Sequence, residues 1–211
     1  SIVALLYLSL HLISTKTNEI DEHRTTLSVQ GAIQTSVNRV STLVIDNAVW
    51  DDAVREVYRP KLDTEWLYNT WGAGFKVNNL YDGTFVLDEH FNVIWGSFQS
   101  QPFAETNLDF FGKGLQALIQ QHGRELPSQK NIYAGITRTR HGVAFVGIGL
   151  IRPMIGRLQV NDGTRRYLVI TRHLNGGILS DLGQTFQIDN LNFTPDKINS
   201  LSMPLRSSAG E

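Results

Sequence analysis

Apolar residues recur at helical spacing through the first quarter of the chain. The opening residues, 1–13, are almost wholly apolar, and beyond them apolar residues continue at that spacing as far as Val44, with polar residues between them. No proline occurs before Pro60, and Gly31 is the only earlier glycine. An apolar stripe of helical period marks a single buried face. The pattern therefore predicts one long amphipathic helix over residues 14–58.

Both parts of this stretch allow two interpretations. A helix needs roughly 20 apolar residues to cross a bilayer, so residues 1–13 are too short to span one by themselves. We interpret them as the outer end of a truncated transmembrane helix, and the alternative is a buried core helix. The narrow stripe of the helix over residues 14–58 fits packing against the same helix of a second copy, or packing on its own domain only.

Shorter elements follow Pro60. Asp63 is a suitable N-cap for a second helix, and Gly123 stands where a later helix should stop. Alternating or wholly apolar stretches bounded by turn residues predict strands. The predicted helices cover residues 63–71, 106–122 and 177–182, and the predicted strands cover residues 84–87, 93–98, 131–139, 143–151 and 165–171, with one more short strand between residues 186 and 193.

This order of elements is similar to that of PAS-like and Cache-like domains. Two strands form a hairpin, a helical insertion follows, and three strands then form a meander. We expect an α+β fold, in which a long N-terminal helix precedes a domain whose five-stranded antiparallel sheet is flanked by helices. The compact domain is expected over residues 59–205, and residues 206–211 are expected to be a tail or linker.

Composition narrows the possible functions. The chain has 211 residues, of which 41% are hydrophobic and 18% charged, and its net charge is −1. Such a chain can bury a full core, and it lacks the basic excess that is typical of nucleic-acid binders. It has no cysteine, which excludes disulfides and thiolate zinc sites. No two of its six histidines have the i, i+4 spacing of a helical metal site. We expect no cofactor and no metal, and no catalytic nucleophile–base set is readable.

One segment resembles a known family. Trp50-Asp51-Asp52 ends the long predicted helix and resembles the signature of the fourth class of CHASE sensory domains. The second predicted helix and the first hairpin follow in the order of that family, although Asn92 stands in the hairpin turn where a glycine is usual. Residues 166–172 resemble the last strand of such domains, and the resemblance extends over roughly residues 30–205.

The resemblance implies the sensing part of a bacterial membrane receptor. The domain would lie in the periplasm, held to the inner membrane by flanking helices and paired with a second copy through its N-terminal helix. The cytoplasmic output would be a GGDEF or EAL domain that makes or degrades cyclic di-GMP, or a histidine kinase. This chain contains none of these outputs, so we expect no enzyme activity from it. The alternative is a ligand-free dimerisation or protein-interaction module of such a receptor.

Several residues are candidates for contact with a small ligand. Aromatic side chains suit a pocket wall, hydroxyl groups can orient a ligand, and a guanidinium can bind a carboxylate through two bonds. Core packing, or a solvated hairpin tip for the arginine, is the simpler alternative in each case. The candidates are Trp50, Asp51, Tyr58, Trp71, Tyr133 and Arg138.

The paired carboxylates of Asp51 and Asp52 need separate roles. Adjacent residues of a helix point about 100° apart, so the two cannot face one direction. For one of them we favour a structural role, in which its carboxylate accepts hydrogen bonds from backbone N–H groups of the following loop. Ligand contact is the second interpretation, and catalysis is the least favoured.

Overall fold

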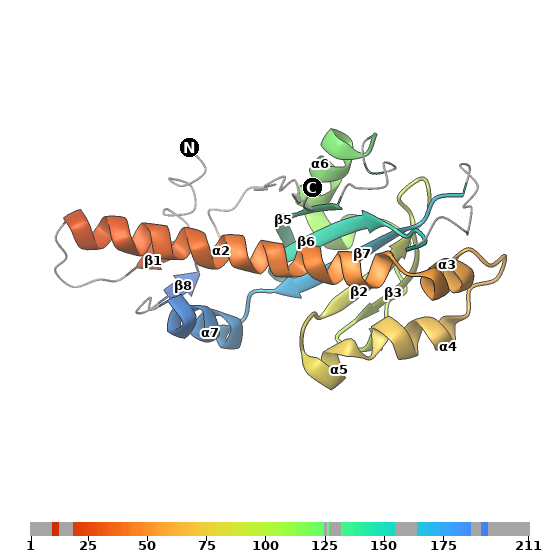
Figure 1. Ribbon diagram of the computed structural model, residues 1–211, viewed down its shortest axis with the longest axis horizontal. Helices are drawn as coiled ribbons and strands as arrows, with labels where there is room; N and C mark the ends of the chain where they lie inside the picture. Colours follow the sequence, from red (N-terminus) through yellow and green to blue (C-terminus); the bar gives the residue numbers. More distant parts are fainter. Residues whose placement is uncertain are drawn as a thin grey trace.

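The computed structural model describes residues 10–12, 19–124, 126, 132–154, 164–186 and 191–193. One helix, α2 (Glu19–Ala48), runs along the molecule, and a sheet with its covering helices is built on its second half (Figure 1). The other elements are β1 (Leu10–Leu12), α3 (Asp51–Val57), α4 (Thr64–Leu67), a π-helical turn (Tyr68–Gly72), α5 (Gly74–Asn78), β2 (Gly83–Leu87), β3 (Val93–Phe98), β4 (Gln101–Pro102), a 3₁₀ turn (Asp109–Phe111), α6 (Gly112–His122), β5 (Ile132–Thr139), β6 (Gly142–Leu150), β7 (Tyr167–His173), α7 (Gly176–Phe186) and β8 (Leu191–Phe193).

The main sheet is antiparallel, with strands in the order β4-β3-β2-β7-β6-β5. Its five long strands are the five predicted ones, so the predicted fold class is confirmed. The sixth strand, β4, was not predicted. It forms because Gln99 and Ser100 take left-handed φ angles of 50° and 57° and turn the chain back, so that Pro102 pairs with Ser97.

One face of the sheet packs directly on α2. Val37, Val40 and Val44 are wholly buried between the helix and the sheet. Opposite them β6 carries two glycines, and a Cβ atom added to Gly147 would lie 2.9 Å from the Val44 Cγ2 atom, while one added to Gly149 would lie 2.8 Å from the Val44 Cγ1 atom. The absence of side chains at these two glycines therefore leaves a groove in which the helix packs.

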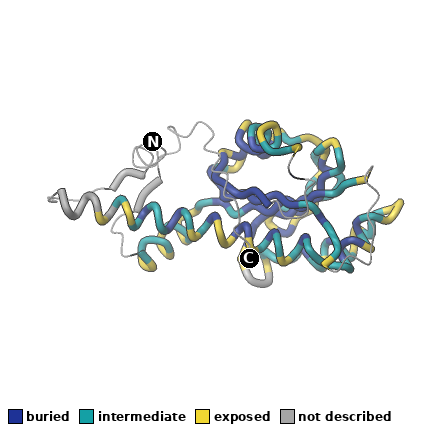
Figure 2. Tube along the Cα trace, turned by 45° about the horizontal axis from the view of Figure 1, so that its top comes forward, coloured by how far each residue is buried: buried dark blue, intermediate teal, exposed yellow. Residues whose placement is uncertain are grey.

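The other face of the sheet is covered by α6 and the 3₁₀ turn. Phe110, Phe111 and Leu115 pack there against Phe85 of β2. Figure 2 shows the strands as a dark-blue buried layer between α2 on one side and α6 on the other. Because both faces are covered, β2 is buried at every position, and this explains why its sequence is a short apolar run rather than an alternating one.

The long predicted helix is interrupted. Residues 14–58 were expected to form one helix, but α2 ends at Ala48 and α3 starts at Asp51. Trp50 lies between them with extended angles (φ −155°, ψ 130°), because the backbone there pairs with Arg152 instead of continuing the helix. The side chains of Val44 and Val54 belong to the same core cluster as Trp71, so the second half of α2 and all of α3 are part of the compact domain.

The first residues also differ from the prediction where they are described. Leu10–Leu12 was expected to be helical but forms β1, which pairs with β8 in a two-stranded antiparallel sheet. The pairing extends these three residues and brings the two ends of the described chain together. The rest of residues 1–13, and the expected tail at 206–211, lie outside the described residues. Among the helices of the described part, none is both long and apolar enough to cross a membrane.

Candidate functional site

The corner between α2 and α3 is held by backbone bonds to the segment that follows β6. The N–H of Arg152 donates to the carbonyl of Ala48 (3.0 Å), and the N–H of Trp50 donates to the carbonyl of Arg152 (3.1 Å). The carboxylate of Asp51 accepts the N–H of Met154 (2.9 Å). We call these five residues the helix–sheet junction. It fixes the end of the longest helix to the sheet at three points.

The two carboxylates of the motif have different surroundings, as their positions on a helix require. Asp51 makes a backbone bond of the kind that the structural interpretation expected, but the N–H comes from Met154 rather than from the following loop. Asp52 pairs with Arg55 one turn later in α3, and both side chains are at least half exposed. An exposed pair of this kind contributes little to stability. Asp51 is therefore the member of the motif that joins α3 to the sheet.

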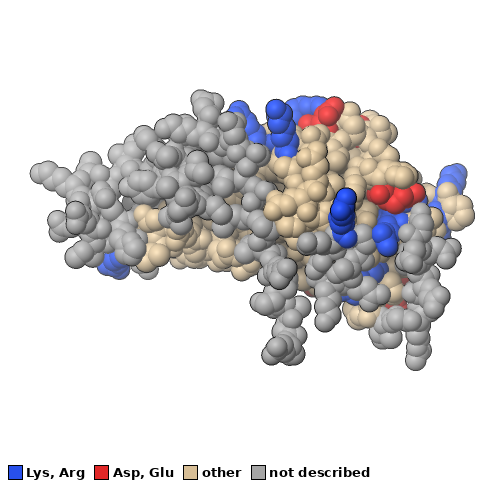
Figure 3. All heavy atoms as spheres, turned by 90° about the horizontal axis from the view of Figure 1, so that it is seen from above, with Lys and Arg blue, Asp and Glu red and all other residues tan. Residues whose placement is uncertain are grey.

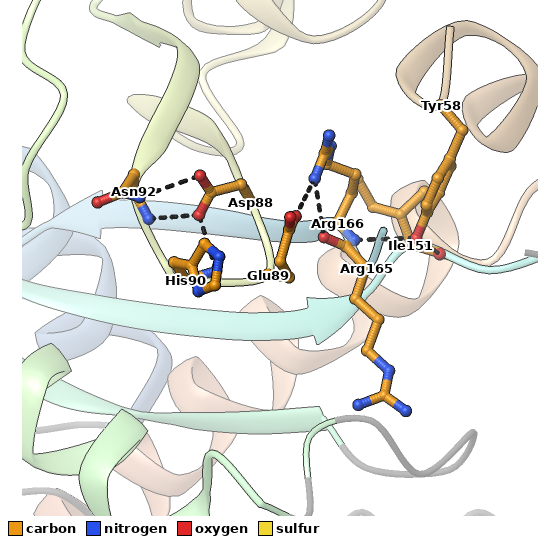
Figure 4. A network of polar contacts seen from close by, with 8 residues as sticks. All are labelled: Tyr58, Asp88, Glu89, His90, Asn92, Ile151, Arg165 and Arg166. Atoms are coloured by element: carbon orange, nitrogen blue, oxygen red, sulfur yellow. Dashed lines mark hydrogen bonds and ion pairs between the residues drawn. The ribbon is translucent and has the colours of Figure 1, made fainter. Parts of the chain in front are cut away.

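Tyr58 connects the same segments from the other end of α3. Its hydroxyl donates to the carbonyl of Ile151 (3.0 Å) and accepts the N–H of Arg166 (2.9 Å), as Figure 4 shows. The end of β6 and the chain entering β7 are thus joined through one side chain. Because burial disfavours the phenolate, the pKa of Tyr58 is raised to about 12. The hydroxyl that could orient a ligand is already bonded on both sides.

An ion pair extends this network to the β2–β3 hairpin. The Arg166 guanidinium contacts the Glu89 carboxylate at 2.5 Å (Figure 4). Glu89 lies in a turn shaped by Asp88, whose carboxylate accepts the N–H groups of His90 (2.9 Å) and Asn92 (2.8 Å). The Asn92 side chain also donates to Asp88 (3.0 Å), so the residue that replaces the usual glycine helps to hold the turn.

Alkaline pH should destabilise the fold partly through Tyr58. Its pKa is raised from 10.0 to about 12, so between these values the unfolded chain loses a proton that the folded protein keeps. The stabilisation is complete below about pH 10 and falls by about 2–3 kcal/mol as the pH rises to about 12. Tyr58→Phe should remove this part of the alkaline loss and cost about 1–3 kcal/mol at neutral pH, because the carbonyl of Ile151 and the N–H of Arg166 lose a partner.

Urea unfolding of both proteins between pH 8 and pH 11.5 measures the effect of Tyr58. The free energy of unfolding should fall more steeply above pH 10 for the unsubstituted protein than for Tyr58→Phe. Parallel curves would contradict the assignment of a raised pKa to this side chain.

All four tryptophans of the chain form one connected row beside the junction. Ring centroids lie 5.6 Å apart for Trp50 and Trp66, 5.7 Å for Trp66 and Trp71, and 6.4 Å for Trp71 and Trp95. Trp71 is wholly buried, and its Nε1 atom has no hydrogen-bond partner among the described residues. The other three are half-buried. The row thus connects the corner at Trp50 with the sheet through the core.

The remaining two ligand candidates lie elsewhere on β5. Tyr133 is buried on the α6 face of the sheet, where its ring stacks on His122 with centroids 4.2 Å apart. Arg138 is exposed near the end of the same strand. The structure therefore brings Trp50, Tyr58 and Trp71 into one cluster on the α2 face, but it does not bring Tyr133 and Arg138 to them.

A buried polar network at the opposite end of the sheet was not predicted. Asp82, directly before β2, is 8% exposed, and its carboxylate contacts the His173 Nδ1 atom (2.9 Å) and accepts the backbone N–H of His173 (2.7 Å). It also accepts the hydroxyl of Thr171 (2.9 Å). The Nε2 atom of His173 lies 2.6 Å from the Thr139 hydroxyl. Three strand ends therefore meet through one imidazole ring.

A sequence signal for this network exists but is weak. Asp82 lies before the first predicted strand and His173 lies just beyond the strand predicted over residues 165–171, so neither residue looked buried. An aspartate and a histidine that end apolar strands are a hint of a paired buried site, since such groups are rarely buried alone. Their partnership across 91 residues could not be read from spacing.

The network is not arranged for hydrolysis. Its Asp–His–hydroxyl order is the order of the serine hydrolase triad. Thr139, however, is 5% exposed, and its oxygen accepts the backbone N–H of His141 (3.1 Å). Within the described ranges, no three His, Cys, Asp or Glu side chains are grouped so that they could hold a metal ion.

Charged side chains of both signs share the surface. On the face seen in Figure 3, red carboxylates lie beside blue basic groups rather than in a patch of their own. Arg140, which is exposed, and Glu105, which is half-buried, form an ion pair at 2.5 Å.

Comparison with known proteins gives a family and a set of similar structures. The family model of the CHASE4 domain matches residues 32–193. Two crystal structures of the LuxQ periplasmic domain from Vibrio cholerae are 14% and 13% identical; the matches cover 78% of this chain and 69% and 70% of those chains, with TM-scores of 0.46 and 0.47. The extracellular domain of a candidate histidine kinase is 17% identical, covering 83% of this chain and 60% of that one at a TM-score of 0.47. The curated proteins gave no match.

Proposed function

This chain belongs to the CHASE4 domain family, and from that membership we propose that it is the extracytoplasmic signal-sensing domain of a bacterial membrane receptor. The packing of α2 on the sheet gives the strongest support for this proposal. Three of its valines are wholly buried against the sheet, and its end is bonded to the sheet at the junction. We therefore expect a change in the sheet to move the helix.

The segments that enter and leave the domain also support this role. β1 pairs with β8, and Phe186 of α7 lies beside Gly31 of α2. Leu182 of α7 packs against the cluster built on Val29 and Ile33 of α2. Because these segments pack side by side, a displacement of the segment that follows the sheet can be transmitted to α2. Figure 1 shows α7 and β8 beside the first half of α2, away from the junction.

We place the domain in the periplasm of an inner-membrane receptor. The flanking helices would hold it to the membrane, and α2 would pair with its twin in a second copy. The exposed Leu27, with 53% of its surface accessible, lies on the part of α2 beyond the sheet and supports such a contact. The output would be a cytoplasmic GGDEF, EAL or histidine kinase domain.

For contact with a small ligand we propose the outer part of the tryptophan row. The ring centroids of Trp50 and Trp66 lie 5.6 Å apart with their planes tilted by 36°, and both side chains are half-buried, so each ring keeps some accessible surface. Trp50 also belongs to the junction, so a ligand held there would act directly on the corner between α2 and α3. Flat apolar or cationic ligands bind to such rings.

A thermal-shift screen of metabolites against the purified chain tests the sensing role. A specific ligand at tenfold its dissociation constant should stabilise the fold by about 1.4 kcal/mol. Trp66→Ala should remove the shift, whereas Arg138→Ala, on the far strand of the sheet, should leave it unchanged.

The interaction module is the second candidate. Self-association of the purified chain in sedimentation experiments is expected of both candidates, because both include pairing through α2. Under the interaction module, however, no compound would shift the unfolding temperature. That outcome would overturn ligand sensing and favour dimerisation as the function of the domain.

A further inference from the structure

We propose that His173, Thr139 and the turn at Gly142 form a proton-operated switch, in which the charge of His173 decides where the Thr139 hydroxyl donates its hydrogen bond. The proposal stands on the geometry of the buried network and does not depend on the proposed sensing role.

Asp82 determines which nitrogen of His173 always carries a proton. Its carboxylate lies 2.9 Å from the Nδ1 atom, and a carboxylate can only accept hydrogen bonds. Nδ1 is therefore the protonated nitrogen of the neutral ring. Any second proton must bind to Nε2, which faces Thr139 at 2.6 Å.

The Thr139 hydroxyl has one proton and two acceptors within reach. It lies 2.6 Å from the His173 Nε2 atom and 3.0 Å from the carbonyl of Gly142. When His173 is neutral, Nε2 has no proton of its own and takes the one from Thr139. When His173 is charged, Nε2 donates to Thr139, and the hydroxyl proton turns to Gly142.

The charged state satisfies every group of this set. The Thr139 oxygen then accepts from His173 and from the N–H of His141 (3.1 Å), while it donates to Gly142. In the neutral state the carbonyl of Gly142 loses the Thr139 bond. Since histidine is the side chain that changes charge between about pH 5 and pH 8, this choice can follow a physiological change of pH.

The charged groups around His173 come from several elements. Asp82 lies before β2, and His141 faces the ring from the β5–β6 turn with centroids 6.5 Å apart. Arg172 precedes His173 on β7 but points to the opposite face of the sheet, where its charge interacts with Arg39 of α2 and Asp181 of α7, and it also interacts with Asp82. Phe98 of β3 and Phe110 of the 3₁₀ turn cover the ring with uncharged surfaces.

The position of the switch connects it to two parts of the fold. The β5–β6 turn carries Arg140, whose N–H bonds to the carbonyl of Phe110 (2.8 Å) and whose side chain pairs with Glu105. On the other side, β7 ends at His173, and α7 begins at Gly176 after two intervening residues (Figure 1). A proton on His173 therefore acts where the sheet meets the helix that packs on α2.

Nuclear magnetic resonance of the labelled chain between about pH 8 and pH 5 tests the switch. We expect the Nε2 resonance of His173, the carbonyl carbon of Gly142 and the amide of His141 to shift along one titration curve. In Thr139→Val the Gly142 and His141 shifts should disappear, and in Thr139→Ser, which restores the hydroxyl, they should return.

Two further controls exclude other histidines. His141→Gln removes the titration of the turn itself and should leave the Gly142 shift in place, as should His90→Gln on the distant hairpin. The proposal is overturned if His173 titrates while Gly142 does not shift, or if His173 keeps one charge state through the whole range. If Thr139→Val does not fold, Thr139→Ala also removes the hydroxyl and keeps the test decisive.

Discussion

Gly147→Val should lower the free energy of unfolding by about 3 kcal/mol or more. A Cβ atom at this position meets Val44 Cγ2 at 2.9 Å and Val40 Cγ1 at 3.0 Å, and the Val40 carbonyl at 3.4 Å. Valine adds two further methyl groups, so α2 must move away from β6 or the strand must bend. Both changes open the core between the helix and the sheet.

Urea denaturation followed by circular dichroism measures this loss. Gly176→Ala is the matched control, because nothing lies within 4 Å of a Cβ atom placed there and alanine favours the start of α7. It should be neutral or slightly stabilising. Val44→Ala should relieve part of the clash, so that the double variant loses less stability than the sum of the single variants. Additive losses would show that the groove does not seat the helix.

Trp71→Ala should cost about 3–5 kcal/mol, the usual range for a large aromatic side chain removed from a core. Trp71 is wholly buried and contacts Trp66 and Trp95 on either side. Trp71→Phe should cost clearly less, since it keeps the ring packing and removes an N–H group that has no partner among the described residues.

Chemical unfolding followed by far-ultraviolet circular dichroism compares the three proteins, with Gln121→Ala on the exposed side of α6 as a control. The order of stability should be the unsubstituted chain and Gln121→Ala, then Trp71→Phe, then Trp71→Ala. A cost under about 1 kcal/mol for Trp71→Ala would mean that this part of the core is not packed as the structure has it.

The pattern of apolar residues was sufficient for the strands of the sheet. Residues 143–151 were predicted as a strand and β6 covers Gly142–Leu150, because turn residues mark both ends of an apolar run. The same pattern was insufficient at residues 49–50. Local spacing continues a helix there, whereas the backbone of Trp50 bonds to Arg152, a partner that only the folded chain supplies.

For the candidate site too, the sequence predicted local features but not contacts between distant segments. The Trp-Asp-Asp motif does lie at the corner of two helices, and Asp51 accepts a backbone N–H group, from Met154. The six ligand candidates do not meet, because Tyr133 packs in the core cluster on the α6 side of the sheet, while Trp71 packs in the cluster on the other side. Which face of a sheet a residue joins depends on strand register, and that is set by partners distant in the sequence.

The sequence by itself determined which segments have a buried face. Hydrophobic periodicity is local, so the long helix, the five strands and the tryptophan-rich corner follow from neighbouring residues. The tertiary structure decided which partners those segments contact. Val44 packs against Gly147, and the backbone of Arg152 bonds to the chain where the long predicted helix is interrupted. The carboxylate of Asp82 contacts the imidazole of His173, 91 residues away in the sequence. Close approach and buried polar pairing require a partner in place, and only the folded chain brings partners from distant segments together.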